Sequence, residues 1–164
     1  LHSGGNSLDY LDLSAPLAPR SLWRWTPTGR TPFSAAFLDD QTAVVALGYG
    51  QGIETISFSD SAPPTTLATA GDEYSWEVEL DGTIAWLSDG YGHLSAWDVN
   101  DPTAPERIGK WKFSPDGNYG NLAVGDGVVV LSGDLSHAVV DVRDPAEPVV
   151  VWEAPTHYLG WGVE

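Results

Sequence analysis

A unit of about 43 residues repeats along this chain of 164 residues, and the repeat limits the possible folds more than any other feature of the sequence. Segment 98–105 is DVNDPTAP, and 43 residues further on segment 141–148 is DVRDPAEP. The related segment 12–19, DLSAPLAP, lies 86 residues before the first of these, and a degenerate copy, SFSDSAPP, occupies 57–64. Four copies in step indicate that one small structural unit is repeated along the chain.

Each unit contains short segments typical of β-strands, separated by Gly, Asp or Pro. The expected strands are 34–38, 42–47, 53–58 and 66–69 in the second unit, 76–80, 83–88, 93–99 and 107–113 in the third, and 121–124, 128–132, 137–142 and 149–153 in the fourth. Two strands, 7–13 and 20–25, are expected in the first unit. The apolar run 43–47 predicts a strand buried on both faces, as in sheets stacked on sheets. No segment has convincing helical periodicity.

Tryptophans recur at matching positions, four or six residues after the last proline of a repeat: Trp23, Trp25, Trp111 and Trp152. Since side chains alternate between the two faces of a strand, an even spacing places them on the same face. They are therefore expected to pack between neighbouring sheets.

Units of four strands and about 40–45 residues are typical of a β-propeller. The chain is therefore predicted to be an all-β single domain made of four-stranded antiparallel meander blades. The segments AWDVNDP at 96–102 and VVDVRDP at 139–145 resemble the LVIVD-repeat family of bacterial propellers. The resemblance extends from about residue 8 to the end and implies the propeller fold, but it implies little about activity. The second unit departs from the family pattern, with Ser57 in place of the aspartate and Ser61 in place of the first proline.

The two ends of the chain are expected to leave blades incomplete. The predicted units are a partial blade at 7–25, blades at 31–70, 74–113 and 119–154, and the start of a further blade at 158–164. The last segment resembles 74–79, the expected beginning of the third unit. We therefore expect an arc of a larger propeller, whose partners are the remaining blades of the same propeller or a partner chain, because unpaired strand edges invite association.

The charge of the chain excludes several classes of partner. The chain has 7 Lys and Arg but 23 Asp and Glu, so its net charge is −16. This charge disfavours nucleic acids and anionic membranes as partners. The apolar runs fall far short of the roughly 20 residues that a membrane span needs. The absence of cysteine excludes disulfides and thiolate metal sites. The absence of cysteine and the shortage of lysine fit many acidic secreted or salt-adapted bacterial proteins. An extracytoplasmic location is expected: secreted, periplasmic or at the cell surface.

Aromatic and polar residues gather in the connections expected at one end of the sheets, those between the second and third strands of a unit and those between units. Rings among hydrogen-bond acceptors suit a polar ligand such as a carbohydrate or a peptide, or a protein. The candidate binding residues are Tyr49, Glu73, Tyr74, Asp89, Tyr91, His93, Asn118, Tyr119, His157 and Tyr158. The alternative is that tyrosines beside glycines merely pack over the ends of the sheets.

Patterns for catalysis and metal binding are weak. The four histidines, His2, His93, His137 and His157, lack the spacing of a zinc site, and the acidic pairs lack that of a calcium loop. Glu77 and Glu79 would share one strand face and could act as an acid–base pair, but a solvated channel wall is the preferred explanation. No nucleophile elbow, phosphate loop or triad spacing occurs. No metal, cofactor or catalytic residue is predicted.

Three functions remain in order of preference. The first is a non-catalytic binding or scaffolding propeller that recognises a polar ligand or a protein. The second is the propeller portion of a hydrolase or lyase, with an active site completed by blades outside this chain. The third is a structural component of a surface assembly. Binding leads because an enzyme needs several titratable groups that converge on one point, and the sequence offers only scattered candidates.

Overall fold

The computed structural model describes residues 2–3, 6–89, 91–113, 119–133 and 136–155, and every regular element in these ranges is a β-strand. The strands are β1 (His2–Ser3), β2 (Leu8–Asp12), β3 (Arg20–Trp25), β4 (Pro32–Asp39), β5 (Thr42–Leu47), β6 (Ile53–Ser59), β7 (Ala62–Ala70), β8 (Glu77–Asp81), β9 (Ile84–Ser88), β10 (His93–Asp98), β11 (Glu106–Lys112), β12 (Tyr119–Gly125), β13 (Val128–Gly133), β14 (Ser136–Asp141) and β15 (Val149–Pro155). Over the same ranges, no helix is long and apolar enough to span a membrane.

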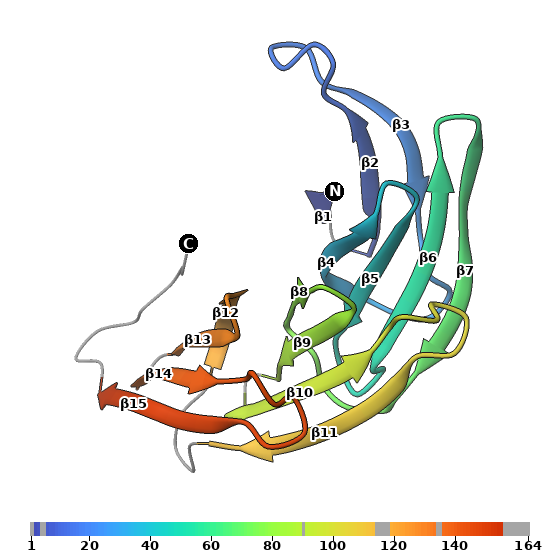
Figure 1. Ribbon diagram of the computed structural model, residues 1–164. Helices are drawn as coiled ribbons and strands as arrows, with labels where there is room; N and C mark the ends of the chain where they lie inside the picture. Colours follow the sequence, from blue (N-terminus) through green and yellow to red (C-terminus); the bar gives the residue numbers. More distant parts are fainter. Residues whose placement is uncertain (1, 4–5, 90, 114–118, 134–135, 156–164) are drawn as a thin grey trace.

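Four antiparallel sheets follow one another along the chain. The first contains β1–β3, the second β4–β7, the third β8–β11 and the fourth β12–β15, and within each sheet strands adjacent in sequence are hydrogen-bonded. Figure 1 shows the sheets in a curved row, with β4, β8 and β12 on its inner side and β3, β7, β11 and β15 on its outer side. Along the inner side β4 contacts β8, and β8 contacts β12. The prediction of an all-β chain made of four-stranded meanders is confirmed.

Two details differ from the sequence-based prediction. The first sheet has a third strand, because β1 pairs with β2 through His2 and Asp9. In the second sheet β7 begins at Ala62 and is much longer than the expected 66–69, because the degenerate repeat forms a tight turn that lets Ser59 pair with Ala62. Prolines are tolerated near the start of β7 because it is the outer strand of its sheet and needs hydrogen bonds on one side only.

The core consists of three apolar clusters, each between two consecutive sheets. On β5, Ala43, Val45 and Leu47 pack against the first sheet. Val44 and Ala46 of the same strand pack against the third sheet. The run 43–47 is therefore buried on both faces, as predicted, and each middle sheet is covered on both sides.

The prediction that the tryptophans pack between neighbouring sheets is confirmed for some of them only. Trp25 is buried between the first two sheets, and Trp111 packs beside the cluster between the third and fourth. Trp23 donates from its indole nitrogen to the backbone oxygen of Ser59 across 2.8 Å and so links the first sheet to the second. Trp152 is 52% exposed, so the prediction of burial is wrong for this residue. The reason is that its side of the fourth sheet has no covering sheet within the described residues.

The repeated DxxDP motif is explained by local hydrogen bonds. In the third unit Asp98 accepts from the backbone nitrogen of Asn100 at 2.9 Å, and Asp101 accepts from that of Thr103 at 2.9 Å. In the fourth unit Asp141 and Asp144 accept from residues 143 and 146 in the same way. Each aspartate thus stabilises a turn by bonding the backbone two residues further on. The additional bond from Arg143 lowers the pKa of Asp141 to about 2.

A leucine buried between two sheets should matter far more to stability than an exposed one. Leu87 lies fully buried between the second and third sheets, whereas Leu17 is fully exposed in a loop. We expect Leu87→Ala to lower the free energy of unfolding by about 2–5 kcal/mol, because it leaves a cavity in a packed layer. The matched Leu17→Ala should change it by less than about 0.5 kcal/mol. Urea unfolding followed by tryptophan fluorescence measures both; similar losses would contradict the stacked-sheet core.

Candidate functional site

Four connections lie at the same end of the first three sheets. They are 26–31 between β3 and β4, 48–52 between β5 and β6, 71–76 between β7 and β8, and 89–92 between β9 and β10. Backbone hydrogen bonds join them: Gly48 donates to Thr31 at 3.0 Å, and Gly52 donates to Glu73 at 2.9 Å. We call this end of the sheets the loop face. It is the end at which the sequence places the candidate binding residues.

Five aromatic side chains form one continuous group on the loop face: Phe33, Tyr49, Tyr74, Trp76 and Tyr91. We call this group the ring cluster. Tyr74 lies at its centre, with ring centroids 5.6 Å from Tyr49 and 5.4 Å from Tyr91, both in edge-to-face geometry. Phe33 contacts Tyr49 at 5.6 Å and Trp76 at 4.9 Å. The cluster is open to solvent, since Tyr49 is 66% and Tyr91 59% exposed.

The loop that carries Tyr49 has an unusual backbone. Tyr49 itself has a φ of 61°, a left-handed conformation that is uncommon for a residue with a side chain. A Cβ at Gly48 would lie 1.7 Å from the Phe33 ring, so only glycine allows this ring to sit against the loop. Strain of this kind persists where the surroundings impose it and tends to occur at binding sites. The GYGQG sequence therefore brings a strained, exposed tyrosine onto the ring cluster.

Glu73 lies beneath the ring cluster rather than on its surface. Its buried carboxylate accepts from the indole nitrogen of Trp97 at 3.0 Å and from the guanidinium of Arg107 at 3.0 Å. The same guanidinium lies 5.9 Å from the centre of the Trp97 ring. With its backbone oxygen bonded to Gly52, Glu73 fixes the connection that carries Tyr74. A buried carboxylate satisfied in this way positions a neighbour and leaves no free charge for a ligand.

Asp89 has the corresponding role under Tyr91. One buried carboxylate oxygen accepts from the backbone nitrogens of Tyr91 at 2.8 Å and His93 at 2.9 Å. The other lies 2.7 Å from Nδ1 of His93 and 3.1 Å from Nζ of Lys110. Asp89 therefore holds the backbone at Tyr91 and His93, and its second oxygen pairs with Lys110.

The structure places the predicted site residues in three groups. Tyr49, Tyr74 and Tyr91 meet in the ring cluster, and Glu73, Asp89 and His93 lie in the layer that supports it. Tyr119 begins β12, but its side chain lies outside the described part of the chain, as do Asn118, His157 and Tyr158 altogether. Phe33 and Trp76 were not predicted, because both stand at the edge of an expected strand. Their signal is aromatic character directly beside the connection.

Glu77 links the third and fourth sheets on the inner side of the row. Its carboxylate accepts from the backbone nitrogen of Leu122 at 2.8 Å. Desolvation raises the pKa of Glu77 above its usual value, outweighing that hydrogen bond, and desolvation likewise raises the pKa of Glu79. The two carboxylates lie on one strand face, as predicted. Within the described ranges no group of three or more His, Cys, Asp or Glu is arranged to hold a metal ion.

Comparison with known proteins shows the fold alone. No family model and no curated protein matches the chain. A protein from Lactobacillus plantarum of known structure is 13% identical, with a TM-score of 0.74 over 90% of this chain and 51% of that one. A functionally unknown protein from Desulfotomaculum acetoxidans is 11% identical, with a TM-score of 0.72 over 94% of this chain and 51% of that one. The chain thus spans about half the length of these two structures.

The raised pKa of Glu77 predicts how stability depends on pH. A group whose pKa is raised by folding stabilises the fold below its unfolded pKa, and this contribution is lost as the pH rises through the folded pKa. We expect Glu77→Gln, which keeps an oxygen acceptor for Leu122, to exceed the wild type in free energy of unfolding at pH 7. The difference should shrink as the pH falls through the raised pKa of Glu77 and should be smallest below about 4, where the carboxyl is protonated in both states.

Urea unfolding at a series of pH values measures this difference. Glu147→Gln is the control, because Glu147 is exposed in a loop and its replacement should leave the pH profile close to that of the wild type. A Glu77→Gln difference that stayed constant from pH 7 to pH 3 would show that the charge of Glu77 is not the cause.

The left-handed backbone at Tyr49 predicts an unusual order of substitutions. Glycine adopts this conformation freely, whereas alanine incurs a cost of roughly 1 kcal/mol or more. We therefore expect Tyr49→Gly to be more stable than Tyr49→Ala by about 1 kcal/mol in urea unfolding. At Tyr74, which lies outside the left-handed region, the order should be reversed. The same order at both positions would contradict the described loop geometry.

Proposed function

We propose that this chain is part of a β-propeller of the LVIVD-repeat type, an extracytoplasmic and non-catalytic module that recognises a polar ligand or a protein through its loop face. Stacked four-stranded meanders and the repeat of about 43 residues support the propeller. The remaining blades come from the same protein or from a partner chain. Two solved structures about twice as long as this chain have a similar fold, which is consistent with an arc of a larger ring.

The ring cluster is the observation that carries the binding function. Its members come from connections on two neighbouring sheets and leave two tyrosines more than half exposed. An exposed aromatic group of this size is unfavourable unless something covers it, and such patches mark interaction sites. Tyrosine suits this role because a ring of few rotatable bonds gives a large contact area at a small entropic cost.

The supporting layer makes the ring cluster rigid. Glu73 and Asp89 hold the connections beside Tyr74 and Tyr91 through buried, charge-assisted hydrogen bonds. A surface fixed before binding loses less entropy when a ligand arrives. These contacts also assign the two carboxylates a positioning role, so that recognition rests on the rings themselves.

A second candidate function rests on His93. Its Nδ1 lies 2.7 Å from the buried carboxylate of Asp89, within ion-pair distance but without hydrogen-bond geometry. A histidine beside a carboxylate is the pairing on which many general bases are built. This pair supports the propeller portion of a hydrolase or lyase. Catalysis is the second candidate because the contacts described for the His93 side chain are all with Asp89, and none is with a hydroxyl group that could act as a nucleophile.

The binding function is tested by alanine substitutions in the ring cluster. Wild-type protein is screened against arrays of neutral oligosaccharides and of lysine-rich peptides, and the best probe of either kind is titrated into Tyr74→Ala and Tyr91→Ala. Each substitution should weaken binding by roughly 1–3 kcal/mol, the loss expected for a central aromatic contact.

Two controls lie at the opposite end of the sheets. Phe37→Ala removes a partly exposed ring near the turn between β4 and β5, and Asp144→Ala removes a loop carboxylate. Neither should change the affinity by more than about twofold, as expected for positions outside the contact. If these variants weaken binding as much as the tyrosine variants do, the loop face is not the recognition site.

A further inference from the structure

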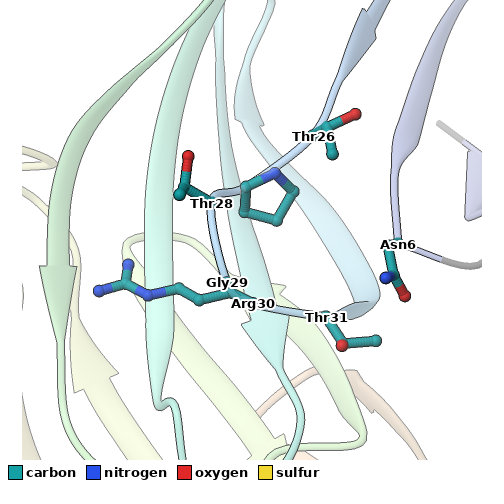
Figure 2. A pocket seen from close by; sticks show the side chains of 7 residues that line it. Asn6, Thr26, Thr28, Gly29, Arg30 and Thr31 are labelled. Atoms are coloured by element: carbon teal, nitrogen blue, oxygen red, sulfur yellow. The ribbon is translucent and has the colours of Figure 1, made fainter.

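A pocket of about 520 Å³ opens on the loop face between the first and second sheets. It is lined by Asn6 before β2 and by the connection 26–31 between β3 and β4 (Figure 2). Its volume falls within the roughly 300–1,000 Å³ typical of small-molecule sites. The sequence did not single out this connection, which carries three threonines, Thr26, Thr28 and Thr31.

The pocket offers hydrogen bonds but no free charge. Threonine hydroxyls both donate and accept, and the amide of Asn6 does the same with separate atoms. The one charged lining residue, Arg30, turns away in Figure 2. Its guanidinium binds the buried carboxylate of Glu54 at 3.2 Å and the hydroxyl of Thr69 at 2.9 Å. The lining therefore suits a neutral ligand rich in hydroxyl groups and offers nothing that would pair with a phosphate or carboxylate.

The wall of the pocket is held in place before any ligand arrives. Gln51 donates from its side-chain nitrogen to the backbone oxygen of Gly29 at 3.0 Å, and its side-chain oxygen accepts from the nitrogen of Thr31 at 3.0 Å. The contact of Arg30 with Glu54 fixes the same connection from the other side. The second half of the connection, residues 29–31, is therefore fixed before binding, which lowers the ordering cost of that wall of the pocket.

The same contacts make the pocket continuous with the ring cluster. Gln51 belongs to the GYGQG loop, two residues after Tyr49, and Thr31 lies two residues before Phe33. The ring of Phe33 in turn contacts that of Tyr49. The exposed ring of Tyr49 therefore belongs to the loop that holds the wall of the hydroxyl-lined pocket. Sugar rings combine these two needs, with hydroxyl groups on their rim and an apolar C–H face that packs against an aromatic ring.

We propose that the threonine pocket and the ring cluster together bind a neutral oligosaccharide. One sugar unit occupies the pocket, bonded to the hydroxyls of Thr26 and Thr28, and the next units extend over Tyr49 toward Tyr91. This inference rests on the proposed binding function and narrows it to one class of ligand. The carboxylates of Glu73 and Asp89 agree with it, because each is paired with a basic side chain and neither is free to select a cation.

The contributions of the pocket and of the rings to the binding affinity can be measured separately. The probes are glucose, galactose and mannose, and neutral hexasaccharides built from each, titrated by isothermal calorimetry and by NMR. The double variant Thr26→Val/Thr28→Val removes two hydroxyls from exposed positions and should weaken both the monosaccharide and the hexasaccharide about tenfold. Tyr49→Ala should weaken the hexasaccharide by a similar factor and leave the monosaccharide within about twofold.

Thr83→Val is the matched control, because Thr83 is an exposed threonine in a turn at the opposite end of the third sheet. It should leave both affinities unchanged. If hexasaccharide binding is kept in the double threonine variant but lost in Tyr49→Ala, the pocket is not a sugar-binding site. The proposed role of the loop face in recognition would still stand. Binding of lysine-rich peptides at the rings, with no binding of any sugar at millimolar concentration, would contradict the proposal that the ligand is an oligosaccharide. The proposed binding function of the loop face would still stand.

Discussion

The whole structure depends on sheets that bury both of their faces. A single four-stranded meander has two faces, and the middle strands here are apolar on both, so that β5 presents alternate residues to the first and third sheets. Neither neighbour can be removed without exposing half of such a strand to water, at a cost of roughly 25 cal/mol for each Å² of apolar surface. Stability is therefore shared along the row, as in other repeat proteins, where each unit depends on those beside it.

This arrangement also explains where the candidate site lies. Strands in a meander pair edge to edge, and the sheets that they form stack face to face. The connections between strands therefore lie at the two ends of the sheets. At one end the DxxDP turns are satisfied by their own aspartates and need no further partner. At the other end the connections are hydrogen-bonded to one another, Gly52 to Glu73 and Gln51 to Thr31. Because the connections of the loop face are bonded to one another across sheets, they can present a continuous surface.

The acidic character of the chain does not translate into an acidic site. Glu73, Asp89 and Glu54 lie beneath the loop face and are paired with Arg107, Lys110 and Arg30, so three of the few basic residues neutralise carboxylates there. Burying a charge is costly unless it is paired and hydrogen-bonded, and these pairs meet that condition. The surplus of negative charge is left to the surface, where it disfavours anionic partners without shaping the rings or the threonine pocket.

The sequence by itself determined the repeat, the strand order and the end of the sheets at which aromatic residues gather, because strand periodicity and turn chemistry are local properties. It predicted β5 as 42–47 and β3 as 20–25, and it identified Tyr49, Tyr74 and Tyr91. Only the tertiary structure decided that Glu73 and Asp89 lie beneath the rings, that Phe33 and Trp76 join them, and that Trp152 is exposed. Whether a carboxylate meets solvent or a guanidinium depends on residues 24 or 34 positions away in neighbouring strands and connections, and no local pattern records which of them will be close.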